Sequence, residues 1–450
     1  MEDTICAVAT LVGESSINVI RVSGNNSIKI VNKIFDKDLS KKNTHTITYG
    51  FIIENDEKID EVLVSVFKSP KSFTTEDIVE INVHGGNITV NKVMELLISN
   101  GARLAEPGEF LKRAFLNGRI DLTQAEAVGD LINAQTEGSR KMALKGIDKT
   151  IFNEISVLKK KILSLIANIE VNIDYPEYED AVIVTKKIIK ENLSEVKSTI
   201  NDLLKNSKKG LLIKNGLKIS IVGKPNVGKS SLLNLLLNED KAIVTNIKGT
   251  TRDIVEGNLI IDGVKVDILD TAGIRQTEDV VESVGVKKSL QAINDSDLIL
   301  FVIDSEYGFD LEDELILNKV KEKNVLVIYN KSDKNKNYKC DKLAKFNNIN
   351  ISTFDKKSLD IINNKISEIF DLKYIGESNY TYISNARQIG LLNNSIKIIR
   401  EIETALKKDY EVDMIEIDLR RLWNTLSSIT GEVNDNDLLN EIFSKFCLGK

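Results

Sequence analysis

A glycine-rich segment at residues 223–230, GKPNVGKS, has the residue types that bind phosphate groups. It follows the apolar stretch KISIVG and precedes SSLLNLLLNED, which predicts a strand, a loop and a helix in that order. Glycines allow backbone N–H groups to converge on phosphate oxygens, and the N-terminus of the helix adds partial positive charge. We expect Lys229 to reach the β- and γ-phosphates of a nucleotide and the Ser230 hydroxyl to bind Mg²⁺.

Two further motifs have the order expected of a Mg²⁺ and γ-phosphate site. DTAG, residues 270–273, ends the predicted strand VKVDILD, so Asp270 can hold the Mg²⁺ shell and Gly273 can donate its N–H to the γ-phosphate. GTTRD, residues 249–253, lies between the phosphate loop and DTAG, where Thr251 can add a second hydroxyl to Mg²⁺. Each motif alone could be an ordinary turn.

NKSD, residues 330–333, follows the predicted strand VLVIYN and can select the base. The Asp333 carboxylate can accept two hydrogen bonds from guanine, whereas adenine would leave this carboxylate unpaired. A fifth motif is weak, because only Ser352 in ISTFDKKSLD fits the Ser-Ala-Lys-like loop that covers guanine. Four motifs in the right order at the ends of predicted strands indicate a domain that binds GTP.

The residue after DTAG decides whether hydrolysis can follow the Ras-like scheme. Ras-like domains have a water-orienting Gln there, but this chain has Ile274, which cannot orient water. Glu282, in VVESVG downstream, could orient water through a second bridging water. It could equally be an ordinary glutamate on an exposed helix surface. Without a catalytic group from elsewhere, hydrolysis would be negligible.

The elements around these motifs predict three kinds of fold. Segments within residues 1–118 alternate apolar and polar residues as strands do, and they predict an α+β domain. Apolar residues at three- and four-residue intervals from Ile151 to Ile169 predict long helices, which return after about residue 377. A second helix, roughly 185–209, is expected to end near the glycines of KKGLLIKNG. Helices separate four apolar stretches, KISIVG, VKVDILD, LILFVID and VLVIYN, and this pattern predicts a parallel sheet covered on both faces. We expect an all-α domain, 119–215 and 378–450, interrupted by a Ras-like α/β P-loop GTPase domain, 216–377; two separate helical domains are the alternative.

Composition limits the other functions. The net charge is −6, so any contact with nucleic acid needs a local basic patch. Three distant cysteines and two histidines exclude a disulfide framework and argue against a zinc site. No apolar run approaches the ~20 residues that span a bilayer, and the N-terminus has no basic leader. We expect a cytoplasmic protein that does not bind membranes.

Four segments outside the GTP-binding motifs carry a family resemblance. They are EDIVEINVHGG (76–86), PGEFLKRAFLNGRIDLTQAEAVGDLI (107–132), SNARQ (384–388) and DLLNEIFSKFCLGK (437–450). Through them the chain resembles the MnmE/TrmE family of tRNA modification GTPases over essentially its whole length. Leu448 stands where the tail of this family usually has Ile.

The resemblance implies a K⁺-dependent GTP hydrolase that acts on tRNA. It would be a homodimer that joins an FAD-containing partner of the MnmG/GidA family in a heterotetramer or larger complex. Together they would add an aminomethyl or carboxymethylaminomethyl group to C5 of the wobble uridine of certain tRNAs. The N-terminal domain would resemble folate-binding domains, dimerise, and bind 5-formyl- or methylene-tetrahydrofolate as the one-carbon donor.

The resemblance also assigns roles to residues. It matches Arg21, Glu80, Arg119 and Lys450 to folate binding, where a carboxylate suits the pterin edge and cations suit the glutamate tail. Glu282 matches the water-orienting glutamate, and Cys447 matches a tail cysteine needed for tRNA modification but not for GTP hydrolysis. The K⁺ ligands would be Asn226, Thr245, Ile247 and Thr250, and the Mg²⁺ ligands Ser230 and Thr251. The residues expected to contact GTP are Asn226, Val227, Gly228, Lys229, Ser230, Ser231, Thr245, Asn246, Ile247, Lys248, Gly249, Thr250, Thr251, Asp270, Thr271, Ala272, Gly273, Asn330, Lys331, Asp333 and Ser352.

Two other functions fit parts of the sequence. A ribosome-assembly GTPase of the Era or Der kind would use RNA binding as its output, but the chain lacks a GXXG module after the GTPase domain and has one such domain, not two. A GTP-driven scaffold would use its N-terminal domain only to dimerise. Folate binding by that domain would separate the scaffold from the enzyme component.

Overall fold

The structure is a computed structural model, and two compact units can be described separately. Unit 1 contains Met1–Gly129, Gly146–Ser198 and Gly390–Lys450, and unit 2 contains Asp130–Lys145 and Thr199–Ile389. The three-domain boundaries expected from the sequence stay a prediction. The residues that the structure describes are 3–11, 13, 15–174, 184–237, 255–269, 292–336, 338–373, 381–433, 436–446 and 449.

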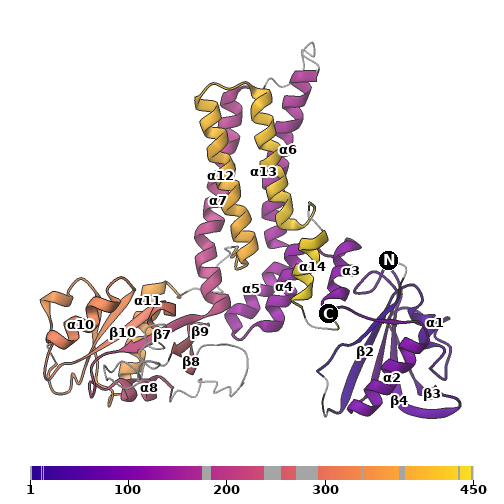
Figure 1. Cartoon of the computed structure of the whole chain (residues 1–450), viewed down its shortest axis with the longest axis horizontal. Helices are drawn as coiled ribbons and strands as arrows, with labels where there is room; N and C mark the ends of the chain where they lie inside the picture. Colours follow the sequence, from indigo (N-terminus) through magenta and orange to yellow (C-terminus); the bar gives the residue numbers. More distant parts are fainter. Residues whose placement is uncertain are drawn as a thin grey trace, which may run out of the picture. The chain divides into compact units, whose positions relative to one another are not determined.

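A six-stranded sheet in unit 1 has the order β3-β4-β5-β2-β1-β6 (Figure 1). All of its neighbouring strands are antiparallel except β1 and β6. Two helices, α1 (Ser27–Val31) and α2 (Asn87–Ser99), pack on one face. Alternate residues of each strand point to that core, so the others form an outer face. The strands are β1 (Ile5–Val8), β2 (Ile17–Ser23), β3 (Thr46–Glu54), β4 (Glu57–Phe67), β5 (Ile78–His84) and β6 (Arg103–Leu104).

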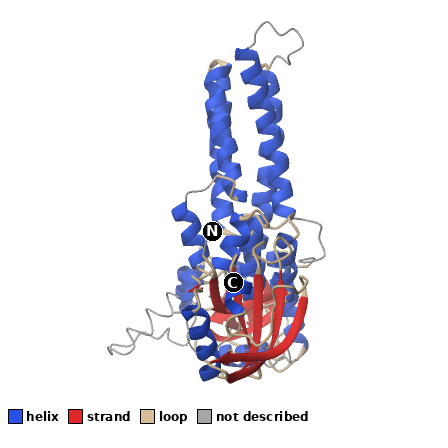
Figure 2. Ribbon diagram, turned by 90° about the vertical axis from the view of Figure 1, so that its right-hand side faces the viewer, coloured by secondary structure: helices blue, strands red, loops and turns tan. Residues whose placement is uncertain are grey.

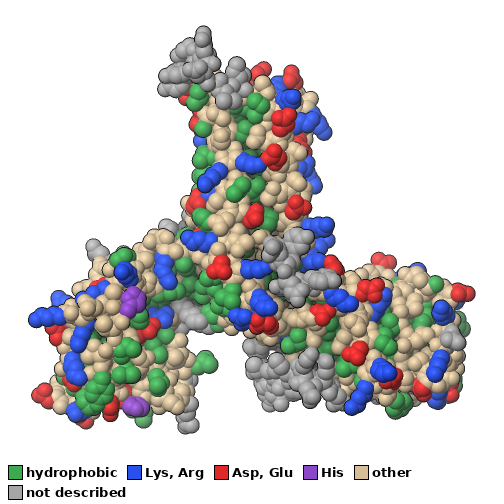
Figure 3. All heavy atoms as spheres, turned by 180° about the vertical axis from the view of Figure 1, so that it is seen from behind, with side chains coloured by type: hydrophobic (Ala, Val, Ile, Leu, Met, Phe, Trp, Pro, Cys, Tyr) green, Lys and Arg blue, Asp and Glu red, His purple; other side chains and the backbone are tan. Residues whose placement is uncertain are grey.

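Long helices form most of the rest of unit 1, and Figure 2 shows them running side by side. The expected apolar stripe of α6 (Thr150–Asp174) is buried, and α6 packs along α13 (Val412–Thr430). Lysine and arginine side chains alternate with acidic ones over the bundle surface seen in Figure 3. No helix among the described residues is long and apolar enough to cross a membrane. The other helices outside the two sheet regions are α3 (Glu109–Leu116), α4 (Leu122–Asn133), α5 (Glu137–Ile147), α7 (Lys186–Asn215), α12 (Ala386–Lys407) and α14 (Asn436–Ser444).

Helix α7 is longer than the sequence suggested. The glycines of KKGLLIKNG predicted a break near residue 209, but the helix continues to Asn215. Gly210 stays helical because the chain packs closely there: a Cβ atom would lie 2.7 Å from the Ile383 carbonyl oxygen. The helix ends instead before Gly216, whose φ of +79° suits glycine.

A second six-stranded sheet, in unit 2, has the order β12-β11-β10-β7-β9-β8. Five strands are parallel as expected, whereas the edge strand β8 is antiparallel to β9. The turn between them, Asp262 and Gly263, has φ values of +46° and +82°, and such a two-residue turn makes a hairpin. The elements are β7 (Leu217–Val222), α8 (Lys229–Leu237), β8 (Val255–Ile261), β9 (Val264–Leu269), β10 (Leu298–Asp304), α10 (Leu311–Val320), β11 (Val325–Asn330), the 3₁₀ helix Asp341–Leu343, β12 (Asn347–Asn350) and α11 (Lys357–Phe370).

Candidate functional site

The phosphate loop lies between the end of β7 and the start of α8, beside the point where the strand order reverses. Ligands of open α/β sheets bind at such a point. Gly228 has a φ of +101°, and a Cβ atom there would lie 2.2 Å from Nδ2 of Asn330. Only glycine fits this position, so the sequence motif and the close approach of the two loops have the same cause.

Lys229 points back into the curve of the loop. Its Nζ donates to the carbonyl oxygens of Gly223 at 2.9 Å and Lys224 at 2.6 Å. The ammonium group is therefore held where the loop would surround phosphate oxygens. Ser230 and Ser231 follow in the first turn of α8 and are exposed.

Asn330 joins the base side of the site to the phosphate side. Its buried Nδ2 donates to the Val227 carbonyl oxygen at 2.8 Å, and its Oδ1 accepts from the Thr353 amide at 3.2 Å. Three segments that are far apart in the sequence are thus brought together at the carboxyl ends of the parallel strands. Lys331, next in NKSD, forms an ion pair with the buried Asp304.

Ser352 and Asp333 are also neighbours, although the motif around Ser352 is weak. The Ser352 hydroxyl donates to Oδ1 of Asp333 at 2.6 Å, and this hydrogen bond lowers the pKa of the Asp333 carboxyl. The Ser352 backbone is held in turn by the Ser358 hydroxyl, which donates to its carbonyl oxygen at 2.7 Å. Asp333 is exposed and ionised, as guanine recognition requires.

Lys224 belongs to the phosphate-loop motif, but the motif did not indicate its ion pairs. Its Nζ lies 2.6 Å from Oδ2 of Asp310 and 3.0 Å from Oδ2 of the buried Asp313. Asp310 caps α10, so this lysine ties the phosphate loop to the start of that helix. The sequence did contain a signal for the start of α10, because Asp310 and Asp313 are acidic residues three positions apart, which is the pattern of a capping box.

Several predicted nucleotide and ion ligands lie outside the described residues. Among the described residues, no group of three or more His, Cys, Asp or Glu could hold a metal ion. Strand β9 ends directly before DTAG, and β8 begins after GTTRD. The roles assigned to the predicted ligands, catalytic residues and tail residues outside the described part of the chain stay predictions. These residues are Thr245, Asn246, Ile247, Lys248, Gly249, Thr250, Thr251, Asp270, Thr271, Ala272, Gly273, Glu282, Cys447 and Lys450.

A second cluster of predicted residues lies on the outer face of the unit 1 sheet. Arg21 of β2 and Glu80 of β5 are cross-strand partners, with Nε and Nη2 of Arg21 at 2.9 and 2.8 Å from Oε1 of Glu80. Arg119 lies 4.7 Å from the centre of the Phe73 ring and donates to the Phe73 carbonyl oxygen at 2.8 Å. Arg21 also lies over this ring, at 5.7 Å.

The tail of the chain reaches this cluster. Nη1 of Arg21 donates to the Gly449 carbonyl oxygen at 3.3 Å. The φ of Gly449 is +89°, and a Cβ atom there would lie 2.5 Å from the Val8 carbonyl oxygen. Three of the four residues assigned to folate, together with the residue before the fourth, therefore meet on one surface.

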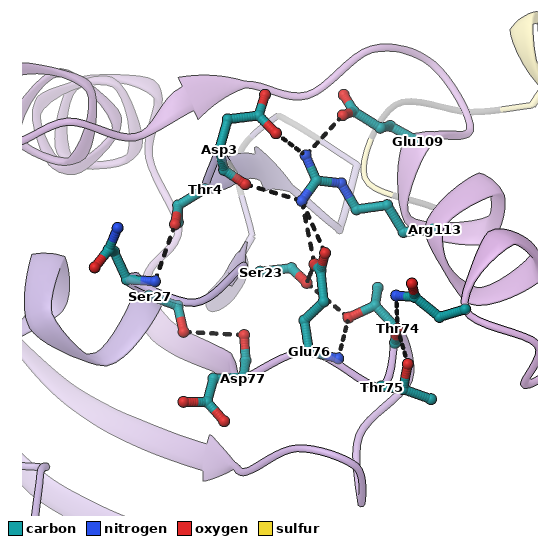
Figure 4. Close-up of polar contacts among 12 residues, drawn as sticks. Asp3, Thr4, Ser23, Ser27, Thr74, Thr75, Glu76, Asp77, Glu109 and Arg113 are labelled. Atoms are coloured by element: carbon teal, nitrogen blue, oxygen red, sulfur yellow. Dashed lines mark hydrogen bonds and ion pairs between the residues drawn. The ribbon is translucent and has the colours of Figure 1, made fainter. Parts of the chain in front are cut away.

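A buried ion network fixes the segment that carries Phe73 (Figure 4). Arg113 of α3 is fully buried and contacts Asp3 at 2.8 Å, Glu76 at 3.1 Å and Glu109 at 3.0 Å. Glu76 also accepts from Ser23 at 2.7 Å. Burial opposes the charge of Glu109, but hydrogen bonds, first from Arg103, lower the pKa of its carboxyl. No local sequence pattern indicated this network, because its members come from separate segments.

Comparisons with known proteins cover the whole chain. A family model described as the MnmE helical domain matches residues 122–447, and one described as the GTP-binding protein TrmE N-terminus matches residues 4–119. The tRNA modification GTPase MnmE of Streptococcus thermophilus is 45% identical over 100% of this chain and 98% of its own length. The protein of the same description from Bacillus cytotoxicus is 44% identical over 100% and 99%. A solved structure of Aquifex aeolicus Era bound to GDP and aluminium fluoride is 31% identical over 40% of this chain and 66% of its own, with a TM-score of 0.28.

Proposed function

The chain belongs to the MnmE family of tRNA modification GTPases, and from that membership we propose its cofactors, partners and working residues. It is a GTP hydrolase that takes part in tRNA modification. We propose that hydrolysis depends on K⁺ and Mg²⁺, and that a tetrahydrofolate donor and an FAD-containing MnmG/GidA-like partner complete the modification of the wobble uridine. The match to MnmE relatives over the full length of the chain argues against a ribosome-assembly GTPase.

The observation that carries GTP binding is the hydrogen bond from Asn330 to Val227. It connects the segment that would recognise guanine to the loop that would surround the phosphates, so one network positions both ends of the nucleotide. Bound Mg²⁺ and K⁺ would supply positive charge at the phosphates. Ser230 would hold Mg²⁺ together with Thr251.

Asn226 fits the role of a K⁺ ligand. It lies on the phosphate loop with a φ of +64°, and its exposed side chain makes no hydrogen bond to a described residue. Its amide oxygen is therefore available for a cation that prefers oxygen ligands. The other proposed ligands are Thr245, Ile247 and Thr250.

Salt exchange tests this proposal. At equal ionic strength and with Mg²⁺ present, GTP hydrolysis should be faster in K⁺ than in Na⁺, and Asn226→Ala should remove the difference while nucleotide affinity stays similar. Glu282→Ala should lower kcat with little change in affinity, because Glu282 is proposed to orient water. Equal rates of the parent protein in the two salts would contradict the K⁺ dependence.

The cluster on the outer face fits a folate ligand. Both contacts from Arg21 go to Oε1 of Glu80, which leaves Oε2 without a hydrogen bond from the described residues. That oxygen can accept from the amino-substituted edge of a pterin, and the Phe73 ring offers a flat apolar surface. Arg119 and Lys450 would bind the carboxylates of the glutamate tail. The folate would supply the one-carbon group.

Calorimetry with 5-formyl-tetrahydrofolate and the full chain tests the folate site. Arg119→Ala and Glu80→Gln should each weaken binding by about tenfold or more, since each removes a charge-assisted hydrogen bond. Arg140→Ala is the matched control, because Arg140 pairs with Glu137 on an exposed helix. Unchanged affinity in both site variants would exclude this cluster as the folate site, and failure of the parent chain to bind would leave the N-terminal domain as a scaffold.

The outer face also supports the proposed homodimer. Large apolar side chains are exposed there on the neighbouring strands β3 and β4: Ile47, Tyr49 and Leu63. A contiguous apolar surface of this kind marks an interaction site. Sedimentation of the full chain should show a dimer that Leu63→Asp weakens; a parent protein that sediments as a monomer would refute it.

Mass analysis of the wobble uridine tests the whole function. tRNA from cells that lack the chain should lose the C5 substituent, and the parent chain should restore it. Restoration by a chain that cannot bind GTP would contradict the proposed coupling of hydrolysis to modification.

A further inference from the structure

A groove runs along α12 and the start of α13, within unit 1. Its cavity has a volume of about 570 Å³. Lys397, Arg400 and Lys408 line it, and all three are exposed. Their spacing places them on one face of the helix and its end, over about 16 Å at a rise of ~1.5 Å per residue. The groove therefore presents a row of positive charges.

These cations are not neutralised by the acids of the groove. None of the three makes an ion pair with a residue that the structure describes. The two carboxylates that also line the groove, Glu401 and Asp418, are both paired with Arg421. The three lining cations together with Arg421 outnumber these two carboxylates by four to two, so the net charge toward a ligand is positive.

Apolar surface lies beside this row. Tyr410 and Met414 line the groove and are 47% and 59% exposed, and Ile417 on the next turn of α13 is 70% exposed. Large side chains that are open to solvent next to unpaired cations suit a ligand that combines anionic groups with flat rings. Nucleotides of a single strand have both, because bases stack on aromatic side chains while phosphates bind cations.

We propose that this groove binds a single-stranded segment of tRNA, with phosphates on Arg400 and Lys408 and a base stacked on Tyr410. The inference rests on the chain's role in tRNA modification. An acidic peptide would also suit the cations, but two observations favour RNA. The exposed Tyr410 ring beside the cations suits a stacked base, and the relatives of the chain are described as tRNA modification GTPases.

Binding of an unmodified tRNA transcript to the full chain tests the groove, measured between about 50 and 200 mM salt, where phosphate contacts weaken strongly. The double variant Arg400→Gln/Lys408→Gln should bind roughly tenfold or more weakly, with a salt slope lower by about 0.7–0.9 for each phosphate that is no longer neutralised. Tyr410→Ala should weaken binding by roughly fivefold to a hundredfold with the slope unchanged, since stacking releases no counterions.

The matched control is Lys160→Gln/Lys407→Gln. Both lysines are exposed on the same bundle and do not line the groove, so this variant removes equal charge from elsewhere. It should bind tRNA like the parent protein. GTP hydrolysis and the thermal midpoint should be unchanged in all these variants, because every substituted side chain is exposed.

Three results would overturn the proposal. Groove variants that bind tRNA and support modification like the parent would exclude the groove as an RNA site while leaving the proposed function intact. Variants that lose affinity only for the FAD-containing protein would show a protein-docking surface instead. Equal weakening by the groove and control variants would show a diffuse charge effect. Failure of the parent chain to restore the modified uridine would instead refute the proposed function.

Discussion

Base recognition depends on one carboxylate and on the hydroxyl beside it. The Ser352 hydroxyl donates to Asp333 at 2.6 Å and lowers the pKa of this exposed carboxyl, which favours its ionised form. The sequence identified both residues, but it could not show that they touch, since 19 positions separate them. Lys224 was missed for the same reason: its partners in α10 are distant in sequence.

Asp333→Asn should change the base preference of the chain. An amide cannot accept both hydrogen bonds from guanine, so GTP affinity should fall by well over tenfold while xanthosine triphosphate gains. Competition binding with GTP, ATP and xanthosine triphosphate measures this. Ser352→Ala is the companion variant and should lower GTP affinity less, because it removes the hydrogen bond to the Asp333 carboxylate but not the carboxylate itself. Unchanged GTP affinity in Asp333→Asn would refute the assignment of NKSD.

At the scale of elements, the sequence predicted those helices and strands that a local pattern of apolar residues determines. The apolar runs placed β7, β9, β10 and β11, and the periodicity from Ile151 to Ile169 placed α6. The antiparallel β8 was missed, although Asp262-Gly263 is a hairpin signal, because the run before it was not recognised as a strand. The continuation of α7 through Gly210 depends on packing against a distant segment, which no local pattern reports.

The ion network around α3 should make the stability of unit 1 depend on pH. Arg113 is fully buried, so Arg113→Leu would leave the buried Glu76 without an ion-pair partner and Glu109 with Arg103 alone. The free energy of unfolding should fall by about 3–5 kcal/mol. Urea denaturation at pH 7, followed by circular dichroism, measures the loss. Arg140→Leu is the control, since its ion pair with Glu137 is exposed to solvent and contributes little to stability.

The direction of the pH effect follows from the lowered pKa of Glu109. The ordinary value is 4.5, and the folded value is lower. The ionised carboxylate therefore contributes stability above pH 4.5, and this contribution is lost as the pH falls through the folded pKa. The parent protein should lose stability between pH 7 and pH 3, and Arg113→Leu should lose less. An equal loss in both proteins would show that other carboxylates control the acid response.

At the scale of the whole chain, segments far apart in the sequence meet within unit 1. Arg21 of the N-terminal sheet donates to the Gly449 carbonyl oxygen, and α14 packs against α3. From the sequence, the tail was expected near the folate site only through the resemblance at Lys450. The hydrogen bond from Arg21 places Gly449, the residue before Lys450, at this cluster. Cys447 is proposed to act in tRNA modification and not in GTP hydrolysis.

Cys447→Ser should therefore separate the two activities of the chain. The substitution keeps the size of the side chain and removes the thiolate, which a neighbouring cation can favour by lowering the thiol pKa. If the thiol takes part in modification, the variant should fold normally and hydrolyse GTP normally, yet fail to restore the modified wobble uridine in cells. Cys340→Ser is the control, since this partly exposed cysteine lies in unit 2. If Cys447 only packs, thermal stability should fall, and hydrolysis and modification should decline together. Full modification by Cys447→Ser would transfer the role to Lys450.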